Sequence, residues 1–334
     1  MLLRTALGTA LFLSVATTGD SLTPKFEKGW TVTYTSSSSE SVVMDDVSVT
    51  LNGQELPPEA LEQMGDFMPP DEESTESVEV QSVIKAVENG LPSVAEHKFI
   101  EYSRSTEKGD ESEEIEDALK GSRVRVTYDG DEELTAELLD DEGEVSETLD
   151  RDVPVMPSLH QVLPDDEVSE GDSWKVNETD LSESNSAFSP FKVTSEDDDD
   201  DDSPADSGRE ALDKAFEDTD AEFTWTKTLD TDDGKVAVIT TEFEIELDLA
   251  EIMSDQMDMD DLPPDSEVTF NATLKIGMTI HWSIEHGRTV EAALNMEMDM
   301  DVDMSMPIQE GMNMEMEMDA DVSMAFESTW TYGG

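Results

Sequence analysis

Few residues in this chain of 334 could perform chemistry. There are four histidines and no cysteine, so neither a thiolate nucleophile nor a cysteine-ligated metal site can form from this sequence. The sequence also contains no His-Glu-x-x-His zinc motif, glycine-rich phosphate loop or Gly-x-Ser-x-Gly elbow. Paired carboxylates carry no information here, because at this acid content every pocket would have them. The sequence predicts a protein that is not an enzyme.

The four histidines lie in surroundings typical of structural or surface residues. His281 falls on the polar side of an alternating segment and His286 in a turn, whereas His160 stands among leucines beside the end of a helix. His97 is the fourth, and no motif surrounds it. We predict no catalytic, cofactor-binding or metal-binding residue, and no cofactor.

Methionine is the unusual residue, with nineteen copies. Many occupy every second position of the C-terminal third, in phase with Leu, Val, Ala and Phe, and Met298 and Met314 are examples. Such phasing favours a buried apolar face that flexible thioethers fill. Two alternatives remain open, an adaptable surface for an apolar ligand and a Cu(I) site, because thioethers are soft ligands.

Acidic and glycosylation motifs have plainer interpretations. Asp230 to Gly234 is too short for an EF-hand calcium loop and is interpreted as a turn. The aspartate run 197–202 predicts a solvated linker, although calcium capture remains an alternative. The triplets that start at Asn177 and Asn271 match the glycosylation sequon.

Charge narrows the possible partners. The sequence has 84 acidic and 19 basic residues, for a net charge of −65, which repels nucleic acids and anionic lipid surfaces. We therefore predict no nucleic-acid partner. Dense carboxylates keep a surface hydrated in concentrated salt, where screening removes their repulsion, so the composition favours a marine or halophilic source.

The N-terminus has the features of a secretory signal. Arg4 precedes an apolar run over residues 5–15, and small residues follow it. We predict a signal peptide over 1–19 and an exported protein, periplasmic or extracellular, that is soluble after cleavage. Nothing later in the sequence is apolar over a length that predicts a membrane helix.

Strict alternation of apolar and polar residues is the main structural pattern. It runs through 268–284, 290–306 and 312–326, with turn residues between these segments, and predicts three long neighbouring strands. Segments 223–229 and 236–247 predict another hairpin. The fold class is therefore mostly β, an antiparallel meander that forms a curved open barrel or a sandwich with a few short helices.

The N-terminal region shows a similar succession of elements. We expect a hairpin from 26–34 and 42–51, a short helix over 58–64 and a strand over 78–87. A helix over 249–257 stands at the corresponding place of the C-terminal region. We interpret 26–87 and 223–284 as a weak internal duplication.

The remaining segments complete the predicted organisation. An acidic linker or loop over 195–206 separates β regions at 20–194 and 207–334, which either form one domain or two. A capping box at Ser207 and Glu210 predicts a short helix after the linker. An added β-ribbon is predicted from three short strands, 123–128, 134–139 and 145–149.

Two short motifs resemble a family of uncharacterised exported bacterial β-proteins found in marine lineages. One is Phe26-Glu27-Lys28-Gly29-Trp30. The other is Leu163-Pro164 followed by Gly171-Asp172-Ser173-Trp174. The likeness covers these motifs and the order of strands, and it implies an antiparallel β fold. The family has no assigned activity, so the resemblance implies no catalytic residues.

We expect a non-enzymatic exported protein that binds an apolar molecule on a curved sheet. The alternative is a structural or protein-binding module at the cell surface, and Cu(I) binding is a minor third hypothesis. The ligand, the partner and the oligomeric state are not determined by the sequence.

Overall fold

The computed structural model describes most of the chain between residues 21 and 333. Side chains are described throughout these ranges except at 44–51, 54–55, 111, 247–248, 267–271, 300–322, 324 and 330. The ranges are 21–51, 54–55, 72–108, 111–128, 134–149, 153–177, 181, 219, 221–231, 234–248, 267–309 and 312–333. The predicted signal peptide, the acidic linker and the three predicted helices lie outside them.

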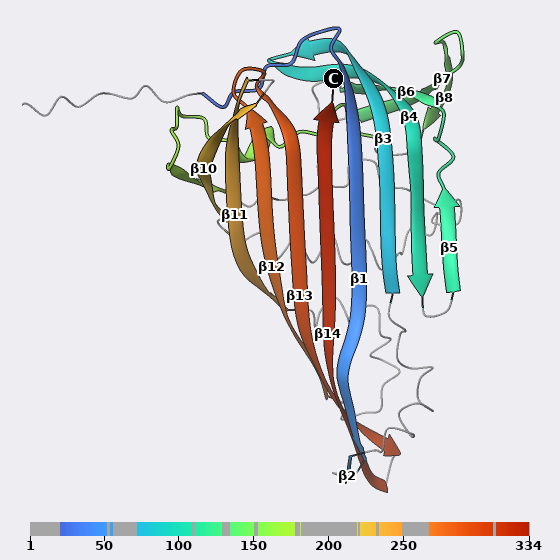
Figure 1. Ribbon diagram of the computed structural model, residues 1–334. Helices are drawn as coiled ribbons and strands as arrows, with labels where there is room; N and C mark the ends of the chain where they lie inside the picture. The colour runs from blue at the N-terminus through green and yellow to red at the C-terminus, as the bar shows by residue number, and fades with distance from the viewer. Residues whose placement is uncertain are drawn as a thin grey trace, which may run out of the picture.

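The described strands form one twisted antiparallel sheet (Figure 1). Their order across the sheet is β8-β7-β6-β4-β3-β1-β14-β13-β12-β11-β10-β9, while β2 pairs with β1 and β5 with β4. The strands are β1 Thr31–Leu51, β2 Gln54–Glu55, β3 Glu72–Glu88, β4 Leu91–Lys108, β5 Glu111–Glu116, β6 Arg123–Tyr128, β7 Leu134–Leu139, β8 Val145–Leu149, β9 Ser173–Val176, β10 Ala221–Thr231, β11 Gly234–Asp248, β12 Glu267–Ser283, β13 Arg288–Gln309 and β14 Met312–Gly333. The prediction of a mostly β antiparallel meander is confirmed.

Alternation predicted the C-terminal strands well. β12, β13 and β14 pair as successive neighbours, and the apolar positions of β12 from Ala272 to Trp282 are buried. The strands β10 and β11 form the predicted hairpin around the Asp230 turn. The three short strands of the added ribbon are confirmed as β6, β7 and β8.

The hairpin predicted from 26–34 and 42–51 is wrong. Residues 35–41 continue as strand, so β1 is a single strand of 21 residues. This segment, TSSSSES, has no Gly, Pro or Asn to form a tight turn. In addition, β1 pairs with β3 along one edge and with β14 along the other. Ladder hydrogen bonds on both edges therefore hold β1 extended.

The predicted duplication fails for the same reason. Residues 223–284 supply three successive neighbours, β10, β11 and β12. Residues 26–87 supply two long strands, β1 and β3, that pair directly, plus the two-residue β2. The two segments therefore differ in connectivity.

Pairing of β1 with β14 joins the beginning and the end of the chain. The ladder runs from Thr33 opposite Gly333 to Leu51 opposite Met316, with one irregularity between Asp45 and Ser48. Both predicted β regions thus contribute to the same sheet. Sequence alternation did not predict β4 and β5. The turn that leads from β3 into β4 is formed by Asn89 and Gly90, which are left-handed with φ of 50° and 86°.

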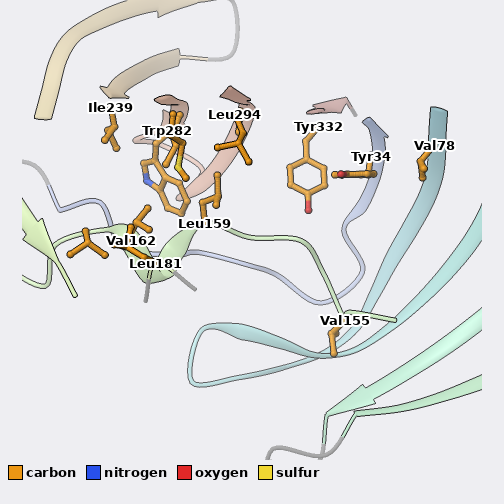
Figure 2. Packing of buried hydrophobic residues seen from close by; sticks show 14 of the residues in the cluster. Tyr34, Val78, Val155, Leu159, Val162, Leu181, Ile239, Trp282, Leu294 and Tyr332 are labelled. Atoms are coloured by element: carbon orange, nitrogen blue, oxygen red, sulfur yellow. The ribbon is translucent and has the colours of Figure 1, made fainter. Parts of the chain in front are cut away.

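One face of the sheet, the inner face, packs against residues 153–168, which we name the cover segment. The cover segment lies near the upper end of the sheet in Figure 1 and contains a short 3-10 helix, η2 His160–Val162. Figure 2 shows Leu159 and Val162 beneath Trp282, with Leu294 alongside. All four side chains are fully or almost fully buried, and burial of each large apolar side chain contributes about 1.5–3 kcal/mol.

Candidate functional site

Hydrogen bonds fix the cover segment to the upper end of the inner face. The Tyr332 hydroxyl donates to the Pro157 carbonyl, and the Trp174 indole Nε1–H donates to the Val162 carbonyl at 2.8 Å. The Nε2 atom of His97, on β4, lies 3.0 Å from the carbonyl oxygen of Pro154. This end of the sheet is therefore a closed, specifically bonded core.

His97 is the histidine whose environment the sequence did not indicate. Because a carbonyl only accepts, Nε2 carries the proton, and the Ser82 hydroxyl donates to Nδ1 over 2.8 Å. The side chain is almost fully buried. Burial lowers the pKa of His97 from 6.5 to about 4, although the hydrogen bonds to the cover-segment backbone oppose this shift.

Below the cover segment, side chains of the inner face line up in rows that cross the sheet. Each row joins register partners on β4, β3, β1, β14, β13, β12 and β11, in that order. The Arg104 row is Arg104, Glu76, Ser38, Ser328, Leu294, Met278 and Thr241. The Ser74 row is Thr106, Ser74, Glu40, Phe326, Met296, Ile276 and Phe243. The Lys108 row is Lys108, Glu72, Val42, Met298, Leu274 and Ile245, and Met324 holds the backbone register position on β14 between Val42 and Met298.

These rows divide the inner face into two halves. The polar half lies on β4, β3 and β1, where hydroxyl and charged groups predominate. The apolar half lies on β14, β13, β12 and β11, where Met, Phe, Leu and Ile predominate. We name the three rows together the binding face.

Burial decreases down β13 and β14 while their inner side chains stay apolar, whereas on β12 Met278, Ile276 and Leu274 stay buried in all three rows. On β13, Leu294 is 1% exposed, whereas Met296 and Met298 are only partly buried. On β14, Ser328 is 1% exposed and the next inner residue, Phe326, is partly buried. Some apolar surface therefore remains accessible on the lower part of β13 and β14.

The polar half contains one arginine without an ion pair to a described residue. Arg104 is partly buried, and its Nε–H donates to the Ser74 hydroxyl at 2.9 Å. Two rows further down, Lys108 is paired with Glu72 at 3.4 Å. The sequence did not indicate this site. A possible signal was the spacing of Ser36, Ser38 and Glu40, which keep the parity of Val32, Tyr34 and Val42.

The other three histidines lie in the kinds of surroundings that the sequence predicted. His281 is on the outer face of β12, with Nδ1 3.0 Å from the Glu291 carboxylate on β13, and His286 is an exposed turn residue. His160 begins η2, with Nδ1 3.1 Å from the Ser158 hydroxyl. None of these three joins the binding face.

The prediction that methionines pack on the apolar face is confirmed for the described side chains of β12 and β13. Met278 is buried, and Met296 and Met298 pack partly buried against the core. The side chain of Met314 lies outside the described residues, as does the aspartate run 197–202. Of the two sequon asparagines, Asn177 is exposed after β9, and Asn271 lies within β12, as predicted.

In both motifs that resemble the exported β-protein family, a tight turn precedes the tryptophan, which is Trp30 in one motif and Trp174 in the other. Gly29, with φ of 92°, precedes Trp30 at the start of β1, and the Arg288 guanidinium lies 5.5 Å from the centre of a Trp30 ring. Gly171, with φ of 96°, precedes β9, where Trp174 stacks on Phe223 at 6.5 Å between ring centres. Both motifs thus have a structural role at the entrance to a strand.

An ionic cluster lies on the outer face, opposite the core. The Glu96 carboxylate pairs with Lys85 at 2.7 Å, Arg125 at 2.9 Å and Arg123 at 3.5 Å. Burial alone would raise the pKa of Glu96, but the hydrogen bonds and charges of Lys85 and Arg125 outweigh it, and the pKa lies below its ordinary value. Three cations share this one carboxylate, so these four residues together carry two surplus positive charges on the outer face.

The described ranges contain neither a metal cluster nor a membrane-spanning helix. No group of three or more His, Asp or Glu side chains in them is arranged to hold a metal ion. Within the same part of the chain, no helix combines the length and the apolar character needed to cross a membrane.

Comparisons with known proteins add little. No family model matches the chain, and no curated protein matches it. A solved structure that resembles it is the crystal structure of the outer membrane protein OprG from Pseudomonas aeruginosa. The likeness has a TM-score of 0.19 and 9% identity over 94% of this chain and 99% of that chain. A score of 0.19 is too low to establish a shared fold, so OprG supports no statement about function or location.

Proposed function

We propose that this is an exported, non-enzymatic binding protein that holds an apolar molecule against the binding face. The observation that carries the proposal is the decrease in burial along β13 and β14. Leu294 is buried beneath the cover segment, whereas Met296, Met298 and Phe326 are only partly buried. A chain with a net charge of −65 has abundant carboxylates for its surface, so apolar side chains on an accessible face favour a binding role.

The side chains themselves suit an apolar ligand. Methionine is unbranched and polarizable and adapts to ligands of irregular shape, and phenylalanine adds a large contact area. The sheet behind them is held by continuous ladders on both sides of β13. The binding face therefore has adaptable side chains on a fixed backbone. The proposal that the protein is exported rests on the signal-like sequence at residues 1–19.

Substitutions at Met298 test the proposal with the neutral fluorescent probe N-phenyl-1-naphthylamine. The wild type should bind the probe, and Met298→Leu should bind it too, because the substitution keeps volume and apolarity. Met298→Asp should weaken binding at least about tenfold, since the loss of about 1.4 kcal/mol of apolar contact alone has this effect. If binding instead depends on the sulfur, Met298→Leu will fail, which would favour a soft-metal site.

Asn295→Asp is the matched control. Asn295 is exposed on the outer face of the same strand, so this variant adds the same charge away from the binding face. It should bind the probe like the wild type. Absence of probe binding to the wild type, or equal binding by Met298→Asp, would contradict the proposal.

A protein-binding role is the second candidate, and the end of the described sheet at β8 favours it. β8 is an end strand, and Tyr128, Leu134 and Val145 in the adjoining ribbon are 38–47% exposed. An edge strand with exposed apolar residues can accept a strand from another chain. Native mass spectrometry of protein from its natural host separates the two functions, because a bound lipid supports the first and a bound polypeptide the second.

A further inference from the structure

Arg104 is a cation placed where an apolar ligand would end. It belongs to the inner face because it follows the buried Tyr102 by two positions and pairs in register with Glu76. Its Nε–H is engaged by Ser74, and no ion pair joins the guanidinium to a carboxylate of a described residue. Its remaining N–H donors form a planar fork that matches a carboxylate or phosphate.

Neighbouring charges restrict what the fork can bind. The charged side chains of the polar half are Arg104 and Lys108 against Glu40, Glu72 and Glu76, a balance of two minus three, or −1. Because Lys108 and Glu72 form an ion pair, the balance at Arg104 is set by Arg104, Glu40 and Glu76. These three residues carry one net negative charge, which repels every anion, so a multiply charged head is repelled more strongly than a singly charged one, and a single charge is held only by direct contact with the Arg104 guanidinium.

Strand spacing gives the reach that a ligand needs. Neighbouring strands lie about 4.8 Å apart, so the three steps from β4 to β14 span about 14 Å and the six steps to β11 about 29 Å. The Arg104 side chain covers part of this distance. A long-chain molecule that lies along the rows would have one end at Arg104 and the other on Phe326, Met296 and the apolar side chains beyond them.

We propose that the ligand of the binding face is an amphiphile with one apolar chain and a singly charged anionic head. The head binds the Arg104 guanidinium, and the chain lies across β14 and β13 on the apolar half. This inference rests on the proposed function, because it names the chemical class of ligand for the same face.

Three probes of equal chain length test the inference by isothermal titration calorimetry. They are dodecanoate, dodecanol and dodecylammonium, used as monomers at pH 8, where the carboxylate is ionised. The wild type should bind dodecanoate about tenfold more tightly than dodecanol, as expected for one charge-assisted contact of about 1.4 kcal/mol. Dodecylammonium should bind most weakly.

Arg104→Gln should abolish the preference for dodecanoate and leave the affinity for dodecanol within about twofold. Lys98→Gln is the matched control, because Lys98 is an exposed residue on the outer face of the same strand. It removes the same charge and should keep the full preference for dodecanoate. Thermal melts of both variants establish that they are folded when they are titrated.

The outcomes separate the inference from the proposed function. If dodecanol and dodecanoate bind the wild type equally, or if dodecylammonium binds best, the inference is overturned and the proposed function stands. A preference for dodecanoate that survives in Arg104→Gln also overturns it, because another group would hold the head. If none of the three probes binds, the proposed function fails and the inference fails with it.

Discussion

Buried His97 makes one link between the sheet and the cover segment sensitive to pH. Its pKa is about 4 in the folded protein, below the ordinary value of 6.5. The unfolded chain therefore takes up a proton first as pH falls, and the stability that neutral His97 contributes is complete above pH 6.5 and decreases toward pH 4. Between pH 7.5 and pH 5 we expect a loss of about 2 kcal/mol from this residue.

Urea unfolding of wild type and His97→Gln at the two pH values isolates this contribution. The variant loses the titrating group, so its stability should fall less than that of the wild type over the same interval. Carboxylates titrate in both proteins and cancel in the difference. An imidazole of His97 that titrates by NMR with a midpoint near 6.5 in the folded protein would contradict the prediction.

At the scale of the element, the β12–β13 turn anchors the N-terminal residues. The Lys25 amide donates to the Gly287 carbonyl at 3.0 Å, and the Lys25 ammonium donates to the Ile284 carbonyl at 3.0 Å. Gly287 has φ of 56°, and a Cβ there would meet the Thr23 carbonyl and lie 2.8 Å from the Lys25 nitrogen. Only glycine fits both the backbone conformation and the close approach.

Gly287→Ala should therefore cost more than the same change at a glycine with open space. Gly29 has φ of 92° and nothing within 4 Å of an added Cβ, so Gly29→Ala should lose about 1 kcal/mol from backbone strain alone. Gly287→Ala should lose a further 1–3 kcal/mol or so, because backbone atoms must move. Urea unfolding measures the free energy of unfolding of both variants. Equal losses would show that the N-terminal segment does not pack closely against this turn.

At the scale of the whole molecule, net charge should govern stability in dilute buffer. A charge of −65 opposes the compact state through self-repulsion, and salt reduces it as the Debye length falls from about 30 Å at 0.01 M to about 10 Å at 0.1 M. We expect the melting temperature to rise by at least roughly 5 °C over this range, corresponding to a gain of about 2 kcal/mol.

Thermal melts in a sodium chloride series measure this effect, with glycerol at matched osmolality as the control for effects other than screening. A melting temperature that stays flat or falls with salt would contradict the salt-adaptation hypothesis. A sharp rise at micromolar calcium, with no response to sodium chloride, would favour specific ion binding by the acidic residues instead.

The sequence by itself determined local pairing. Period-two alternation predicted β12, β13 and β14 and which side chains of β12 are buried, because successive residues of a strand face opposite sides. The hairpin turns at Asp230 and His286 were also predictable, since turn chemistry is local. The apolar half of the binding face followed from the same alternation at Met296 and Met298.

Only the tertiary structure decided the remaining features, because they depend on contacts between segments far apart in the chain. β1 passes through a serine run as one strand since β3 and β14 pair with it on both sides. His97 is neutral because it is buried against the cover segment, where the Pro154 carbonyl, 57 positions away, accepts a hydrogen bond from its Nε2. Arg104 faces the apolar half across β3 and β1 through the register of strands that no local pattern specifies, so the polar end of the binding face could not be read from the sequence.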